Sequence, residues 1–147
     1  MENIISFKTN LGWINISENN SYILSISFGK KNNKGSSKTL FSIKKQIKDY
    51  LNGKKVNWNV KTQVNGTKLQ KKIWNELLKI PYGETRSYGE IAKNVNTSPR
   101  YVGNVCGQNK HLIIVPCHRV IKGDGNLGGF SGNGGIYLKA RLLNLEK

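Results

Sequence analysis

The stretch of sequence that decides the fold reads Ile113-Ile114-Val115-Pro116-Cys117-His118-Arg119-Val120-Ile121. Polar residues enclosed by two apolar runs need a chemical or a structural reason. A thiolate is the nucleophilic form of cysteine, and neighbouring His or Arg side chains favour it, so Cys117 lies among residue types suited to activation. The alternative is structural: Cys117 would be a small buried hydrophobic residue, and His118 a hydrogen-bonded core histidine.

Two short helices are predicted upstream of this stretch. Ser87 and Glu90 form a capping box that opens the first helix. Ser98 is the expected N-cap of the second helix and Pro99 its first residue, and Gly107 ends it. Two short helices joined by a tight turn predict a helix-turn-helix, a pattern shared by DNA-binding proteins and many other helical pairs.

A longer helix comes before this pair and another follows the glycine-rich loop at 123–135. Thr67 and Gln70 form a capping box for the earlier helix, and Pro81 stops it. Its apolar stripe consists of Leu69, Ile73, Trp74, Leu77 and Leu78. The closing helix is indicated by Leu138, Leu142, Leu143 and Leu145.

The first half of the chain has the pattern of short strands followed by one helix. Residues 4–8, 13–17 and 22–28 partly alternate between polar and apolar, which predicts an antiparallel meander. An amphipathic helix follows, ended by Gly53, with apolar positions at Leu40, Ile43, Ile47, Tyr50 and Leu51. Residues 54–66 have no clear period and fit either a strand or a link between lobes.

The chain is strongly basic: 24 Lys and Arg against 8 Asp and Glu give its 147 residues a net charge of +16. Such a charge favours nucleic acid as a partner and an anionic membrane surface as the second choice, although a general lysine bias gives the same balance. Residues 91–123 are more informative because they hold no acidic residue. Their cations form a candidate phosphate face: Lys93, Arg100, Lys110, Arg119 and Lys122.

Other classes of protein are disfavoured. No apolar run is long enough to span a membrane, and the start lacks the pattern of a signal peptide, so we expect a soluble cytoplasmic protein with reduced cysteines. We expect no metal and no cofactor. Cys106, His111, Cys117 and His118 lack the usual spacing of zinc ligands, and the glycine-rich loop is not a nucleotide-binding fingerprint.

Three motifs together resemble one family. Pro116-Cys117-His118-Arg119-Val120, the downstream Gly128-Gly129-Phe130-Ser131-Gly132 and the upstream Tyr82-Gly83-Glu84 with Tyr88 are similar to the O6-alkylguanine-DNA alkyltransferases, also called methylated-DNA-protein-cysteine methyltransferases. The resemblance is strong from Thr67 to Glu146, whereas the first half fits only in length and element order. It implies an α/β (α+β) fold. A ribonuclease-H-like lobe at 1–62, with a small antiparallel sheet and a helix, would precede a helical lobe at 63–147 with a winged-helix-like helix-turn-helix.

The resemblance also implies a function and catalytic residues. The chain would be a monomeric single-turnover DNA repair enzyme that flips O6-alkylguanine out of double-stranded DNA and transfers the alkyl group irreversibly to Cys117. His118 would take the thiol proton through a water, and Glu146 would orient His118. Tyr88 would donate toward the base, and Asn109 would tie the helix-turn-helix to the active-site turn.

The implied DNA-binding and pocket residues complete the expectations. Arg100 would fill the space that the flipped nucleotide leaves, with Ser98, Tyr101, Gly103 and Asn104 also on the DNA-binding face. The base pocket would use Val120, Phe130, Ser131 and Gly132. Tyr101 and Asn104 replace the very small residues common in the family, and the loop after Ser131 is two residues longer. The main alternative is a non-enzymatic helix-turn-helix protein with a structural cysteine; a cysteine hydrolase is another, while Cys117 disfavours the alkyltransferase-like proteins that lack it.

Overall fold

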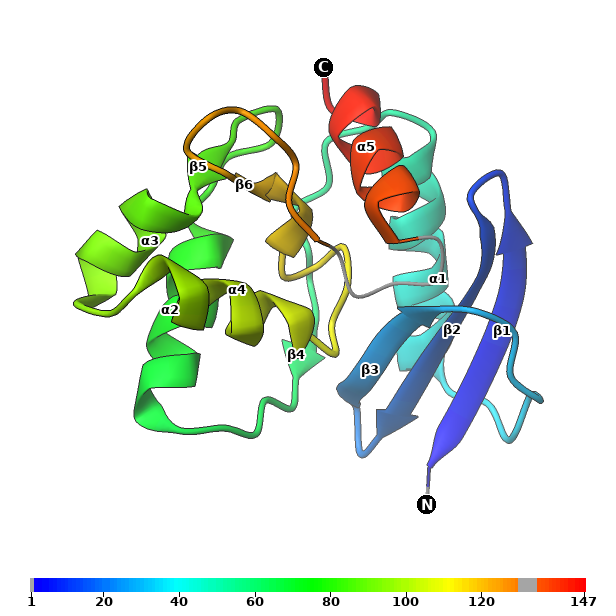
Figure 1. Ribbon diagram of the computed structural model, residues 1–147. Helices are drawn as coiled ribbons and strands as arrows, with labels where there is room; N and C mark the ends of the chain where they lie inside the picture. Colours follow the sequence, from blue (N-terminus) through cyan, green and yellow to red (C-terminus); the bar gives the residue numbers. More distant parts are fainter. Residues whose placement is uncertain (1, 130–134) are drawn as a thin grey trace. The chain divides into compact units, whose positions relative to one another are not determined.

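The protein is described by a computed structural model that covers residues 2–129 and 135–147 (Figure 1). The chain forms two compact units, Met1–Val64 with Lys110–Leu112 and Asn65–Asn109 with Ile113–Lys147. No sequence pattern indicated that three residues from the second half belong to the first unit. None of the helices within these described ranges has the length and apolar character needed to cross a membrane.

The first unit contains a four-stranded sheet in the order β1-β2-β3-β4. Strands β1 (Asn3–Thr9), β2 (Gly12–Asn19) and β3 (Tyr22–Phe28) form the predicted antiparallel meander. Asn20 and Ser21, with φ of 53° and 68°, make the two-residue turn between β2 and β3, because this turn needs positive φ at both central positions. Residues 54–66, which fitted either a strand or a link, include a two-residue strand, β4 (Lys61–Thr62), that is parallel to β3.

Helix α1 (Lys38–Leu51) packs on this sheet and confirms the predicted amphipathic helix. All five predicted apolar positions are buried, and so are the sheet residues of the same unit's core: Phe7, Ile14, Ile16, Ile23 and Ile26. The Ser37 hydroxyl accepts a hydrogen bond from the Leu40 amide at 3.1 Å and begins the helix. Gly53 follows the last turn with φ of +87°, a conformation that glycine adopts without strain.

The second unit is mainly helical. Its helices are α2 (Lys68–Leu78), α3 (Tyr88–Val95), α4 (Pro99–Gly107) and α5 (Gly135–Leu145), with a 3-10 turn η1 (Cys117–Arg119) and the strands β5 (Arg86–Ser87) and β6 (Val120–Ile121). Both predicted capping boxes are present. Asn96 ends α3 with φ of 60°, and the Ser98 hydroxyl accepts from the Tyr101 amide at 3.1 Å, so the predicted tight turn joins α3 and α4.

The connection between α4 and η1 differs from the simple apolar run that its sequence suggests. The Ile26 amide donates to the Lys110 carbonyl at 2.7 Å, and the Leu112 amide donates to the Ile26 carbonyl at 3.2 Å, so this segment extends the β3 edge. Nε2 of His111 lies 3.0 Å from the Ile23 carbonyl oxygen. Ile113 then has φ of 76°, which costs a β-branched residue about 1–3 kcal/mol.

Candidate active site

Cys117 lies on a tight turn. The Cys117 amide donates to the Val115 carbonyl at 2.8 Å and the Arg119 amide donates to the Pro116 carbonyl at 2.9 Å, which curls the chain around Pro116. Strand β6 follows this turn and pairs in parallel with β5, the strand that leads directly into Tyr88. This pairing brings the start of α3 next to the cysteine turn.

Asn109 fixes this turn from the end of α4. Its Nδ2 donates to the Val115 carbonyl at 2.9 Å and to Cys117 Sγ at 3.2 Å. The structure therefore places Asn109, at the end of α4, in contact with the turn that carries Cys117.

Cys117 is only 3% exposed, and burial raises the pKa of its thiol to about 11. The hydrogen bond from Asn109 and the positive charge of Lys139 oppose this shift but do not outweigh it. The sequence predicted that the neighbours favour the thiolate. In the resting site the desolvation of a buried anion is the larger effect, so Cys117 is a thiol at neutral pH.

His118, Arg119 and Glu146 form a buried network beside Cys117. Glu146 Oε2 lies 2.7 Å from His118 Nε2 and 3.0 Å from Arg119 Nη2, and Oε1 accepts from Arg119 Nε at 2.8 Å. Burial lowers the pKa of His118 despite the carboxylate, so the imidazole is neutral at pH 7. A neutral ring that donates from Nε2 to Glu146 has Nδ1 as its proton-accepting nitrogen.

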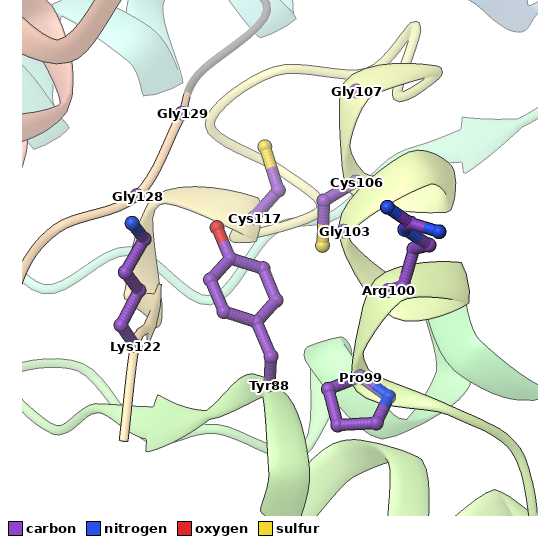
Figure 2. Close-up of a pocket in the computed structure, with 10 residues that line it drawn as sticks. All are labelled: Tyr88, Pro99, Arg100, Gly103, Cys106, Gly107, Cys117, Lys122, Gly128 and Gly129. Atoms are coloured by element: carbon purple, nitrogen blue, oxygen red, sulfur yellow. The ribbon is translucent and has the colours of Figure 1, made fainter. Parts of the chain in front are cut away.

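A pocket of about 430 Å³ opens onto Cys117 (Figure 2). The predicted residues Tyr88, Arg100 and Gly103 line it, whereas Ser98, Tyr101, Asn104 and Val120 are not among its lining residues. The other lining residues are Pro99, Cys106, Gly107, Lys122, Gly128 and Gly129. Phe130, Ser131 and Gly132 lie outside the described residues.

The polar residues of α4 and of its N-cap differ in exposure. Arg100 and Asn104 are exposed, and Tyr101 is half-buried. Ser98 is exposed but its hydroxyl already caps α4. Of these residues, only Arg100 is both solvent-exposed and part of the pocket wall.

Tyr88 lies in the pocket wall with its hydroxyl in contact with Lys139, a residue that the sequence interpretation missed. Lys139 is 0% exposed, and its Nζ lies 3.1 Å from Tyr88 Oη and 3.1 Å from the Gly129 carbonyl oxygen. Burial raises the pKa of Tyr88 to about 12, so its hydroxyl remains protonated. The signal was a cation on the buried face of α5, between Leu138 and Leu142.

The described residues around Cys117 do not form a cluster of metal ligands. Within residues 2–129 and 135–147, no three His, Cys, Asp or Glu side chains gather where they could hold a metal ion. Cys106 lines the pocket but its pKa is raised to about 12 by burial and by its proximity to Cys117. Of the two cysteines, only Cys117 is followed by a histidine, and that histidine contacts the buried carboxylate of Glu146.

The second unit is similar to a known protein family. A family model described as "6-O-methylguanine DNA methyltransferase, DNA binding domain" matches residues 68–147. The inducible methylated-DNA--protein-cysteine methyltransferase of Bacillus subtilis is 46% identical over 104 residues, 69% of this chain and 57% of that protein. The Methanosarcina acetivorans enzyme of the same name is 46% identical over 69% of this chain and 65% of its own length. The matched part is thus less than two thirds of these relatives.

The likeness extends to the fold. The crystal structure of Mycobacterium tuberculosis OGT in complex with DNA superposes with a TM-score of 0.85 at 34% sequence identity, over 97% of this chain and 92% of that one. This likeness includes the first unit, in which sequence similarity was weak. The mixed α/β architecture of this chain is therefore that of the OGT structures.

Proposed function

This chain belongs to the 6-O-methylguanine DNA methyltransferase family, and from this premise we propose that it repairs O6-alkylguanine in duplex DNA by moving the alkyl group onto Cys117. One observation carries the proposal: a buried thiol opens into a pocket and is followed directly by a histidine whose Nε2 lies 2.7 Å from a buried carboxylate. The nucleophile and the base are thus adjacent in the chain, and the base contacts its orienting group. No cofactor is needed for this reaction.

The chemistry starts with the thiol proton. A thiol with a pKa of about 11 costs about 5 kcal/mol to ionise at pH 7, because each pKa unit corresponds to about 1.4 kcal/mol. A neutral His118 can take the proton, through a water, while the attack proceeds, so a free thiolate does not have to form beforehand. Glu146 stabilises the imidazolium, and Arg119 holds Glu146 in place by two hydrogen bonds.

The transfer itself is a single displacement. The C–S bond forms at Cys117 while the bond between the alkyl carbon and O6 breaks, and the electron pair stays on guanine. Tyr88, whose hydroxyl is protonated and lines the pocket, donates toward the base as this negative charge develops. Because the product thioether has no leaving group that water can displace, each chain reacts once.

The DNA interface is proposed to be the face that carries α3, the turn at Asn96 and α4. Arg100 is exposed at the first turn of α4 and lines the pocket, so its side chain is placed to occupy the gap left by a flipped nucleotide. Ser98, Tyr101, Gly103 and Asn104 would contact the duplex around it. Binding would depend mainly on phosphates, since residues 91–123 hold no acidic side chain.

We further propose two functional lobes, 1–62 and 63–147. The order of three antiparallel strands, one helix and a strand parallel to β3 supports the ribonuclease-H-like description of the first. The helices α2, α3 and α4 next to the small β5–β6 sheet support the winged-helix-like description of the second.

Intact mass measurement tests the proposal directly. After mixing with a duplex that contains O6-methylguanine, the chain should gain one methyl group (about 14 Da), and peptide mapping should place it on Cys117. Cys117→Ser should bind the duplex without gaining mass, while Cys106→Ser should behave as the unmodified chain. Repeated turnover would indicate a hydrolase. Binding to one unmodified sequence without mass gain would support the helix-turn-helix protein with a structural cysteine.

The role of Arg100 has its own test. Arg100→Ala should slow single-turnover transfer from duplex DNA far more than transfer from the free O6-methylguanine base, which needs no flipping. Lys93→Ala, on exposed α3, should only lower the salt dependence of binding by about one unit. Equal slowing of Arg100→Ala on both substrates would refute the flipping role.

A further inference from the structure

The first unit has a surface charge that the site at Cys117 does not use. Residues 1–64 contain eleven lysines against three acidic residues, Glu2, Glu18 and Asp49. Glu18 is only 3% exposed, and Asp49 is half-buried and pairs with Lys45 at 3.2 Å and with Lys54 at 3.9 Å. Positive charge therefore dominates the exposed surface of this unit, and the partner that such a charge favours is a polyanion.

The outer face of α1 gathers part of this charge around an aromatic ring. Lys38, Phe41, Lys45 and Lys48 follow one another at positions i, i+3, i+7 and i+10, so they form a strip along the helix. The buried residues of α1 repeat with the same spacing two positions later, which places the strip on the opposite side of the helix. The three lysines are exposed, and the Phe41 side chain is 55% exposed between them.

A groove of about 350 Å³ lies beside this strip. Lys38 and Ser42 of α1 line it on one side, and Asn59 and Lys61 line it from the segment that contains β4. Gln46 holds the two sides together, because its side chain accepts a hydrogen bond from the Asn59 amide at 3.0 Å and donates to the Asn59 carbonyl at 3.4 Å. None of the described residues that line the groove is acidic. The groove is thus a feature of the folded unit, with a lysine from each side.

A second exposed ring lies next to this groove. Tyr22 is 44% exposed and follows Ser21, which lines the groove, and Lys61 pairs with Tyr22 across the β3–β4 ladder with its Nζ 5.9 Å from the ring centre. In the part of the first unit that the structure describes, Tyr22 and Phe41 are the only exposed large hydrophobic side chains. Both are chain neighbours of groove residues, since Phe41 precedes Ser42.

We propose that this groove and the outer face of α1 bind single-stranded DNA: the lysines contact its phosphates, and Tyr22 and Phe41 stack on its unpaired bases. The inference goes beyond alkyl transfer, because it assigns a binding surface to the unit that does not contain Cys117.

The combination of groove, cations and open rings selects this partner. A positively charged groove follows a phosphate backbone, and an aromatic side chain stacks on any base whose face is free. Bases in a duplex are covered by their neighbours, so the two rings favour an unpaired strand. An anionic membrane surface fits less well, because a helix that lies in a membrane needs a broad apolar face. The exposed strip of α1 has only Phe41 as an apolar side chain.

Photo-crosslinking locates the strand on the protein. The whole chain is mixed with an oligothymidylate of about ten nucleotides in which 5-iodouracil replaces some thymines, and the adducts are mapped by peptide mass. Adducts are expected on Tyr22 and Phe41, and adducts confined to the second unit would overturn the proposal. The strand contains no guanine, so the result does not depend on whether Cys117 accepts an alkyl group.

The affinity for the same strand tests stacking. Phe41→Ala should weaken binding about tenfold, as expected for the loss of one stacked base. The matched control is Leu78→Ala, which removes a hydrophobic side chain of similar exposure (54%) from α2 and should leave the affinity unchanged. Unchanged affinity of the Phe41→Ala variant, or a duplex of equal length that competes as well as the single strand, would refute the role of the rings.

The salt dependence of binding tests the lysines. Combined replacement of Lys38, Lys45 and Lys48 by glutamine should lower the slope of log affinity against log salt by about two units, since each phosphate contact on a single strand contributes about 0.7. The control removes the same charge at β1 and in the loop beside it, at the opposite edge of the sheet from β4, by glutamine at three exposed positions: Lys8, Lys31 and Lys34. Equal changes in the two triple variants would overturn a defined site.

Vesicles of phosphatidylserine and phosphatidylcholine provide the remaining comparison. The parent chain should bind the single strand more tightly than these vesicles at the same salt concentration. Tighter binding to the vesicles that is lost in Phe41→Ala would assign this face to a membrane surface and overturn the proposal.

Discussion

Replacing His118 with glutamine should change how transfer depends on pH. The glutamine side chain of the His118→Gln variant can still donate an N–H to Glu146, so the buried carboxylate keeps a partner, but no group remains to accept the thiol proton. The parent chain reacts through a neutral His118 and a protonated Cys117. Its rate should therefore be flat from about neutral pH to near the Cys117 pKa of about 11.

The size of the effect follows from the Cys117 pKa. Without a base, only the preformed thiolate reacts, and with a pKa of about 11 it makes up about one chain in ten thousand at pH 7. Its fraction rises tenfold per pH unit, so the variant should gain about a hundredfold between pH 7 and 9. At pH 7 the variant should be slower than the parent by about 10²–10⁴, the usual range for a general base.

Acid should affect the two proteins differently. As the pH falls, the parent loses activity when His118 takes a proton, and because its pKa is lowered from 6.5 this loss begins only below that pH. The assay is single-turnover methyl transfer from saturating duplex DNA between pH 5 and 9, with Cys106→Ser as the control. A flat profile for the His118→Gln variant, parallel to the parent, would refute His118 as the base.

Three further substitutions, one of them with a matched control, test the scaffold of the site. Leu142→Ala, at a side chain that is 0% exposed, should cost about 2–5 kcal/mol of unfolding free energy in urea titrations. Asn109→Ala removes the second of two donors to the buried Val115 carbonyl and the donor to Cys117 Sγ, so it should cost about 0.5–1.5 kcal/mol and raise the pKa of Cys117 further, measured by iodoacetamide profiles. Gly128→Ala, whose added Cβ would lie 2.8 Å from Tyr88 Oη, should slow methyl transfer markedly, whereas Gly129→Ala, whose added Cβ meets nothing within 4 Å, should not; equal rates would contradict this packing argument.

The local elements were predictable because each has its signals within a few residues. The capping boxes at Thr67 and Ser87 satisfy amides three residues away, so the sequence alone places the starts of α2 and α3. The five apolar positions of α1 repeat at the helical period and are all buried. Short-range chemistry of this kind does not depend on the rest of the fold.

The segment from Lys110 to Ile113 was not predictable for the opposite reason. Its hydrogen bonds go to Ile23 and Ile26, more than 80 residues earlier in the chain, and no local pattern indicates such a partner. Ile113 adopts a positive φ that its own side chain disfavours, so local preference even argues against the observed backbone. The energy for this conformation comes from burial and from the bridge to β3.

The site residues divide in the same way. Cys117 and His118 are adjacent, so the motif itself indicates that they act together. Glu146, in contrast, could be placed only by resemblance, because 28 residues separate it from His118. Lys139 had neither advantage. The hydrophobic period indicates the buried face of a helix, and in α5 it is the leucines that show this period, whereas Lys139 does not contribute to it. A lysine on that face needs hydrogen-bond acceptors inside the protein. The acceptors that Lys139 contacts are the Tyr88 hydroxyl and the Gly129 carbonyl, and both residues line the pocket. The residue that breaks the apolar pattern is therefore the one whose partners identify what the helix supports.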